Sequence, residues 1–245
     1  MERLSILIPA YRRHPMTVRH VAECLKVSRL PDEIIVVNDG GTPDLREMLL
    51  ELKPFPAKVI YARVSEDILW NYNGACNLGF WISTGDVIVL EDTDHIPSKD
   101  AYKNALFILK ERPEIDRVGF KRRVVKIEEM SKPIEEWQHI KTWGSNQMVT
   151  AFRRDMYIKL KGQDERFCGN YGYMAMSWKD RYHNILKVKS ATADFYWALV
   201  GDEGEPGLVR GMSKANRYWY KETSKQGHPQ HPKGILNFTY TYEIL

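Results

Sequence analysis

Short apolar runs alternate with segments of helical spacing along the first 112 residues. The apolar runs predict buried strands at residues 4–9, 33–37, 57–63 and 86–90. Between them, apolar positions recur at the helical interval and predict helices at residues 15–28, 43–52, 74–81 and 100–112. Strands alternating with helices are typical of an α/β domain with a mainly parallel sheet covered by helices on both faces.

The pattern is less regular in the second half of the chain. Strands are predicted at residues 118–125 and 148–152, and helices at 155–161, 173–183 and 213–222. The charged and aromatic segment 126–142 is expected to be a loop or a mobile segment, and the last twenty residues have no clear pattern. Because no repeat or composition break divides the chain, we expect a single domain over residues 1–245.

Polar residues follow three of the predicted strands. They lie in residues 9–11, 38–40 and 91–97. Ligands of open α/β sheets bind beyond the carboxyl ends of the strands, so these residues are the candidate site. Asp39 is placed to accept a hydrogen bond from a base or ribose, and Tyr11 to stack on a base. Each also has a structural interpretation, as a turn aspartate and as a surface or core aromatic.

Asp92 and Asp94 form the sharpest chemical signal. Two carboxylates one residue apart, in a turn after a buried strand, can converge on one hard cation such as Mn²⁺ or Mg²⁺. A cation held there would stabilise a diphosphate leaving group as a Lewis acid. The pattern alone is weak evidence, because Asp-x-Asp also occurs in ordinary turns and helix caps.

The order of these motifs resembles the family 2 inverting glycosyltransferases of GT-A fold. The resemblance extends from about residue 4 to about residue 180, and its segments are residues 7–11, 36–40, 74–79, 84–94, 151–154 and 162–167. It implies a GT-A domain with a nucleotide-binding half (1–100), an acceptor-side half (101–225) and a C-terminal tail (226–245).

The resemblance also implies roles for individual residues. Pro9, Tyr11 and Asp39 would contact the nucleotide base, and Asp92 and Asp94 would hold Mn²⁺ or Mg²⁺ against the diphosphate. Ala75 and Asn77 would lie near the diphosphate and ribose. Ser145 and Asn146 would lie near the sugar or the acceptor. The implied reaction moves a sugar from a nucleoside-diphosphate sugar, with UDP-sugar favoured, to a glycan or other hydroxyl acceptor.

Three positions depart from the family pattern. Cys76 stands where an arginine is usual, and Asn38 stands where a second aspartate is common. Tyr173 and Met174 replace the acid that serves as general base, which an inverting transfer needs to take the acceptor proton. Asp164 is the candidate base that we assign. The carboxylates that remain open as alternatives are Glu165, Asp180, Asp202 and Glu203.

The third metal ligand is also open. His95 directly follows the aspartate pair and could reach the metal or the acceptor, or could simply pack in the turn. His228 and His231 have His-x-x-His spacing, but they lie in a proline-flanked segment that is typical of a surface tail. The group of Arg12, Arg13 and His14 could contact phosphate, and a solvated loop is an equal alternative.

Composition narrows the class of protein. The three cysteines, Cys24, Cys76 and Cys168, are an odd number at wide spacing, so neither a disulfide framework nor a CxxC metal site is expected. With no signal peptide or membrane span recognised, we expect a cytoplasmic protein.

Two alternatives to the transferase remain. A degenerate protein could bind nucleotide sugar without efficient catalysis, since the expected acid is missing. A transferase could also act on modified nucleic acid, because basic stretches occur at residues 117–126 and 210–225. The net charge of +4 is mild and does not by itself argue for nucleic-acid binding.

Overall fold

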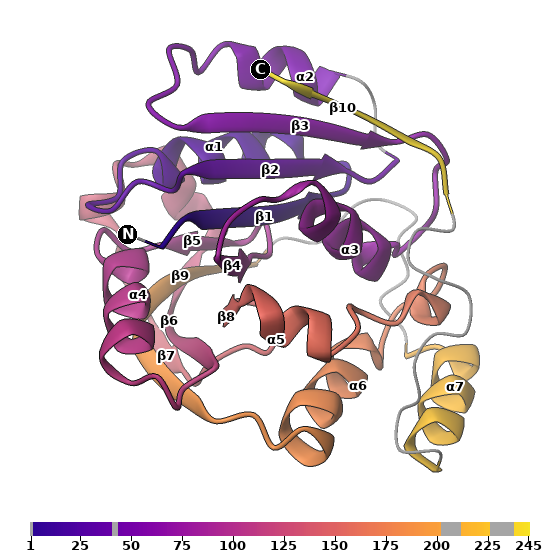
Figure 1. Ribbon diagram of the computed structural model, residues 1–245. Coiled ribbons are helices and arrows are strands. Elements are labelled where there is room, and N and C mark those ends of the chain that lie inside the picture. Colours follow the sequence, from indigo (N-terminus) through magenta and orange to yellow (C-terminus); the bar gives the residue numbers. More distant parts are fainter. Residues whose placement is uncertain (1, 41–43, 202–211, 226–237) are drawn as a thin grey trace.

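The computed structural model describes residues 2–40, 44–201, 212–225 and 238–245. Its centre is a mixed sheet with the strand order β10-β3-β2-β1-β4-β8-β6-β9-β5, and β7 pairs with β6 (Figure 1). The strands are β1 (Leu4–Ala10), β2 (Glu33–Asn38), β3 (Lys58–Val64), β4 (Val87–Leu90), β5 (His95–Pro97), β6 (Arg117–Lys126), β7 (Lys141–Trp143), β8 (Thr150–Arg153), β9 (Ser190–Val200) and β10 (Tyr240–Ile244). The α-helices are α1 (His14–Cys24), α2 (Asp44–Leu50), α3 (Tyr72–Ile82), α4 (Ala101–Glu111), α5 (Arg154–Lys159), α6 (Met174–Asp180) and α7 (Lys214–Lys225).

Parallel pairing joins β3, β2, β1 and β4, as the alternation of strands and helices predicted. The sheet then changes direction, because β8 is antiparallel to both β4 and β6. The mainly parallel α/β sheet expected from the sequence is therefore confirmed for the centre of the domain. Antiparallel strands extend it on both sides.

Helices cover both faces of this sheet, which explains why its central strands are apolar over most of their length. On β1, Ile6 and Ile8 pack with residues of α1, α2 and α4. Leu7 points to the other face and packs with residues of α3, α5 and α6. Successive side chains of a strand point to opposite faces, so a strand buried on both faces is mainly apolar, and its few polar side chains need hydrogen-bond partners, as Ser5 and Glu33 have in each other.

Three segments of the structure lay beyond the sequence predictions. β9 was not predicted, although it is one of the longest strands and pairs with both β6 and β5. β10 lies in the tail and pairs with β3 at the sheet edge, where its side chains are largely exposed. Segment 126–142, expected to be a loop or mobile, contains two 3₁₀ turns, η1 (Ile127–Ser131) and η2 (Ile134–Glu136).

Within the described ranges, no helix combines the length and the apolar character needed to cross a membrane.

Gly85, in the tight turn between α3 and β4, provides a test of the packing. A Cβ atom there would lie 2.3 Å from Ser5 Oγ and 2.7 Å from the Ser5 backbone nitrogen. We therefore expect Gly85→Ala to lower the free energy of unfolding by about 1–3 kcal/mol, the usual range for overpacking. Gly144, around which a Cβ would meet nothing within 4 Å, is the matched control. Gly144→Ala should change stability by less than about 0.5 kcal/mol in the same urea titration, and equal effects would contradict the packing argument.

Candidate functional site

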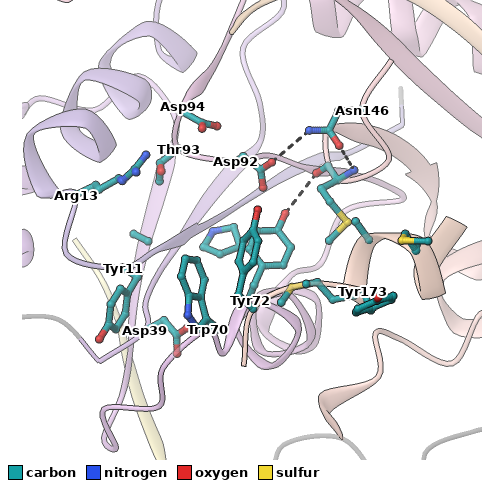
Figure 2. Close-up of a pocket in the computed structure, with 18 of the residues that line it drawn as sticks. Tyr11, Arg13, Asp39, Trp70, Tyr72, Asp92, Thr93, Asp94, Asn146 and Tyr173 are labelled. Atoms are coloured by element: carbon teal, nitrogen blue, oxygen red, sulfur yellow. Dashed lines mark hydrogen bonds between the residues drawn. The ribbon is translucent and has the colours of Figure 1, made fainter. Parts of the chain in front are cut away.

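A pocket of about 490 Å³ lies beyond the carboxyl ends of β1, β2 and β4 (Figure 2). The strand-end side of its lining consists of Pro9, Ala10, Tyr11, Arg13, Asp39, Asp92, Thr93 and Asp94. The remaining lining residues are Trp70, Tyr72, Asn146, Met148, Tyr171, Gly172, Tyr173, Met174, Ala175, Met176 and Met212. The three strand-end groups singled out in the sequence therefore meet at one pocket.

Asp39 forms one end of the pocket. Its backbone nitrogen donates to Ala10 O at 2.8 Å, which holds the ends of β1 and β2 together. Its carboxylate is almost fully buried and accepts a 2.8 Å hydrogen bond from Asn71 Nδ2. Burial raises the pKa of Asp39 to about 7, against the lowering effect of the Asn71 hydrogen bond. Asp39 is thus a buried acceptor that holds a proton more readily than an ordinary aspartate.

The turn after Asp39 needs a glycine. Gly40 has φ +84°, and a Cβ there would lie 2.7 Å from the backbone of Asp67. Asp67 in turn accepts a 2.9 Å hydrogen bond from the Tyr11 hydroxyl and pairs with Arg12 at 3.0 Å. Burial and the Asp67 hydrogen bond raise the pKa of Tyr11 to about 12, so this hydroxyl stays protonated. Gly41 lies outside the described residues.

The aspartate pair forms a second part of the pocket wall. Donor atoms of Asp92, Asp94 and His95 all lie within 4.8 Å of one another. His95 Nδ1 is 2.6 Å from Asp94 Oδ1, and Asp92 Oδ2 accepts a long 3.5 Å hydrogen bond from Asn146 Nδ2. Burial, and then the charge of Asp94, raises the pKa of Asp92. The two neighbouring carboxylates offer oxygen atoms of the kind that Mn²⁺ and Mg²⁺ prefer as ligands.

His95 is buried next to this pair. Burial alone would lower its pKa, but the neighbouring carboxylate of Asp94 outweighs that effect and the pKa is raised. The other ring nitrogen, Nε2, is buried without a hydrogen-bond partner among the described residues. His228 and His231, the alternative third ligands, lie outside the described residues.

The pocket wall of residues 171–176 is aromatic and apolar. Tyr173 and Met174, which stand where the family has its acid, both line it. Tyr173 has φ +65°, and its ring lies 5.4 Å from the ring of Tyr220 on α7. In the part of the chain that the structure describes, the carboxylates lining the pocket are Asp39, Asp92 and Asp94.

The candidate general bases lie elsewhere or are not described. Asp164 is buried, is bound by Arg166 at 2.6 Å, and caps the short helix η3 (Glu165–Phe167) through the Arg166 backbone nitrogen. It is not among the residues that line the pocket. Asp180 accepts hydrogen bonds from Tyr220 and Asn184. Glu165 accepts a 2.7 Å hydrogen bond from Asn77 and does not line the pocket either, while Asp202 and Glu203 fall outside the described residues.

Two predicted nucleotide contacts, Ala75 and Asn77, lie in the buried part of α3 and do not line the pocket. Asn77 Nδ2 donates to Gln163 O at 2.8 Å and to Glu165 Oε1 at 2.7 Å, and its Oδ1 accepts from Tyr157. These bonds join α3 to the segment before η3. Cys76 is fully buried in the same helix and faces the core.

Several lining residues carried no clear signal in the sequence. Trp70 and Tyr171 contact each other with ring centroids 4.8 Å apart, although they are 101 positions apart in the chain. Tyr72, at the start of α3, also lines the pocket, as does Met212. Asn146, which was expected near the sugar or acceptor, lines it too, whereas the exposed Ser145 does not. Asn71 could have been suspected as a polar residue just before a helix.

Two curated proteins are similar in sequence to part of the chain. An undecaprenyl-phosphate 4-deoxy-4-formamido-L-arabinose transferase from Pectobacterium atrosepticum is 33% identical over 102 residues, which are 38% of this chain and 29% of the relative. An uncharacterized glycosyltransferase from Rickettsia bellii is 29% identical over 94 residues, 38% of this chain and 13% of that protein. The chain therefore matches less than a third of the length of either relative.

Solved structures share the fold. The mannosyltransferase PcManGT from Pyrobaculum calidifontis, in complex with GDP-Man and Mn²⁺, superposes with a TM-score of 0.61 at 17% identity, over 83% of this chain and 58% of that one. TarS 1-349 of S. aureus superposes with a TM-score of 0.62 at 12% identity, over 80% and 60% of the two chains. Residues 5–178 match the family described as glycosyl transferase family 2. The chain therefore belongs to glycosyl transferase family 2 and has the GT-A fold.

Proposed function

We propose that this protein is a metal-dependent glycosyltransferase that moves a sugar from a nucleoside-diphosphate sugar, with UDP-sugar favoured, to a hydroxyl acceptor. One observation carries the proposal: a single pocket joins the buried carboxylate of Asp39 to the paired carboxylates of Asp92 and Asp94. Family membership supports it, and it disfavours a degenerate protein that only binds nucleotide sugar. A solved structure of similar fold contains GDP-Man and Mn²⁺.

The base would bind at the Asp39 end. Asp39 would accept a hydrogen bond from a ring N–H of the base, as uracil offers at N3. Tyr11 and Trp70 line the same part of the pocket and present aromatic surface to a flat ring (Figure 2). A buried carboxylate with one protein donor keeps acceptor positions for such a ligand.

The metal would bind to Asp92 and Asp94. The ring of His95, whose Nδ1 lies 2.6 Å from Asp94 Oδ1, would orient the Asp94 carboxylate through this hydrogen bond. Mn²⁺ or Mg²⁺ there would act as a Lewis acid on the diphosphate leaving group. The two carboxylates would hold the cation at the pocket wall, where both side chains line the pocket.

Arg13 would contact the diphosphate. It is the one cationic side chain that lines the pocket among the described residues. Figure 2 shows it on the same side as Thr93 and Asp94, with Tyr11 and Asp39 further along the wall. This position is close to the proposed metal end, where the phosphates of a nucleotide would lie. Cys76, in the position of the family's usual arginine, is buried in α3 and cannot serve in this way.

We keep Asp164 as the proposed base only because it lies in the acceptor-side segment 162–167. Its ion pair with Arg166 and its position outside the pocket wall favour a structural role instead. A base at neutral pH needs to reach the acceptor hydroxyl directly or through one water.

The donor site can be tested by thermal stabilisation. A panel of UDP-, GDP-, dTDP- and CDP-sugars would be measured with Mn²⁺, with EDTA, and with the double variant Asp92→Asn and Asp94→Asn. A ligand present at 100 times its Kd stabilises the native state by about 2.7 kcal/mol, which is a clear rise in Tm. We expect one nucleotide class to raise Tm in the presence of Mn²⁺, with the rise reduced in EDTA and in the double variant. No rise with any donor in the wild type would refute the proposal.

The role of Arg13 can be separated from base binding by comparing UDP with uridine. We expect Arg13→Ala to weaken UDP binding about tenfold, because a charge-assisted contact contributes about 1.5–3 kcal/mol, and to leave uridine binding unchanged. Arg112→Ala removes an equal charge from an exposed residue just after α4 and is the control. If both variants weaken UDP equally, net charge rather than Arg13 is responsible.

The raised pKa of Asp39 predicts a specific pH dependence of stability. Between pH about 4 and pH about 7 the folded state holds a proton at Asp39 that the unfolded state has released. The free energy of unfolding should therefore fall as pH rises through this window, by at most about 4 kcal/mol. Asp39→Asn has no such proton. The difference in free energy of unfolding between wild type and this variant, measured by urea titration, should therefore change across the same pH window by up to about 4 kcal/mol. Parallel pH profiles of the two proteins would show that Asp39 titrates normally.

A further inference from the structure

Glu91 is a buried carboxylate that directly precedes the aspartate pair. It is 0% exposed. Its Oε1 accepts hydrogen bonds from the hydroxyls of Tyr102, at 2.8 Å, and Tyr196. Its Oε2 lies 2.6 Å from His20 Nε2 and 3.6 Å from Cys24 Sγ. A carboxylate has about four acceptor positions, so these four neighbours occupy its full capacity.

The two tyrosine hydroxyls and the Cys24 thiol of this cluster keep their protons at neutral pH. Burial raises the pKa of Tyr102 and of Tyr196 well above the ordinary value for tyrosine, and Glu91 adds to the effect on both. Burial and Glu91 likewise raise the pKa of Cys24. Each of these three groups therefore keeps its proton and can serve as a donor within the cluster.

The distances identify a hydrogen-bond network rather than a second metal site. His20, Cys24 and Glu91 are all metal-ligating types, and their donor atoms lie within 4.8 Å of one another. However, two ligands of one tetrahedral zinc ion, each about 2.1 Å from it, are about 3.4 Å apart. The 2.6 Å between His20 Nε2 and Glu91 Oε2 is instead a hydrogen-bond distance.

The side chains of the network connect three elements, α1, α4 and β9, to the end of β4. His20 and Cys24 come from α1, Tyr102 comes from α4, and Tyr196 comes from β9. The backbone nitrogen of Glu91 also donates to Leu7 O of β1 at 3.0 Å. Glu91, the residue before Asp92, is therefore fixed by hydrogen bonds to α1, α4, β9 and β1.

β9 holds the aspartate turn at a second point. The Leu199 backbone nitrogen donates to Asp94 O at 2.9 Å, and His95 pairs with Ala198 in the sheet. Within the turn, the His95 nitrogen donates to Asp92 O at 2.9 Å. Tyr196 thus anchors the chain before the aspartate pair, and Leu199 anchors it after the pair.

We propose that Glu91 is a positioning residue whose buried hydrogen bonds hold Asp92 and Asp94 in the orientation that lets both bind one cation. Two neighbouring carboxylates repel each other, so an unanchored turn would relax by separating them. The network prevents this and thereby organises the metal site in advance. This inference rests on the proposed metal-dependent function.

The test compares Glu91→Gln with Glu33→Gln. Glu33 is an equally buried carboxylate, which accepts hydrogen bonds from Ser5 Oγ at 2.7 Å and from Thr84, but it lies at the opposite end of the parallel strands. Mn²⁺ affinity and, in EDTA, uridine affinity would be measured by calorimetry on each folded protein. We expect Glu91→Gln to weaken Mn²⁺ binding about tenfold or more, as loss of a partner behind a metal ligand typically does, with uridine affinity within about twofold of wild type. Glu33→Gln should leave both affinities unchanged.

The outcomes separate positioning from general damage. Both variants can lower Tm, so Tm is not the readout. Wild-type Mn²⁺ affinity in Glu91→Gln, or an equal loss of Mn²⁺ and uridine binding, would overturn the inference. If Glu91→Gln does not fold, Tyr196→Phe removes one donor and keeps the ring, and it should weaken Mn²⁺ binding several-fold. A wild-type protein that binds no Mn²⁺ would refute the proposed metal function itself, and the role of Glu91 with it.

Discussion

Parallel pairing of β2, β1 and β4 is the constraint on which the site depends. Ala10 aligns with Asn38, and Leu7 aligns with Leu90, so the three strands end at the same edge of the sheet. The backbone bonds from Asp39 to Ala10 and from Glu91 to Leu7 extend this pairing past the last strand residues. Groups more than fifty positions apart in the chain are thereby brought to one pocket.

Concentrated negative charge is the second feature of this pocket. Asp39, Asp92 and Asp94 all line it, and burial raises the pKa of both Asp39 and Asp92. Such an arrangement is unfavourable in an unliganded protein, because buried carboxylates lose solvation and repel one another. A bound cation and a donor N–H would relieve these costs. The ligands that we propose would thus offset a cost in stability that the unliganded pocket carries.

The wall formed by residues 171–176 is organised by a more distant part of the chain. Asn216 on α7 is fully buried and donates to the backbone oxygens of Phe167, Asn170 and Gly172 at 2.8–3.0 Å. This side chain fixes the loop that presents Tyr173 and Met174 to the pocket.

Much of the central fold followed from the sequence alone. Strands buried on both faces carry continuous apolar runs, as β1 and β2 do over most of their length, and such runs are recognisable without any partner. The residues just beyond those strands, Asp39, Asp92 and Asp94, could be assigned to one site for the same reason. These are local patterns, and a general rule about parallel sheets connects them.

Only the tertiary structure decided the rest. β10 exposes most of its side chains and has no apolar face to signal it, so its pairing with β3 is visible only after folding. The assignment of Asn77 to the nucleotide and the choice of Asp164 as base relied on position in a motif, whereas the fold shows what each side chain contacts. Trp70, Tyr171 and the partners of Glu91 come together across long separations in the chain. No sequence period records such contacts, because they depend on how whole elements pack against one another.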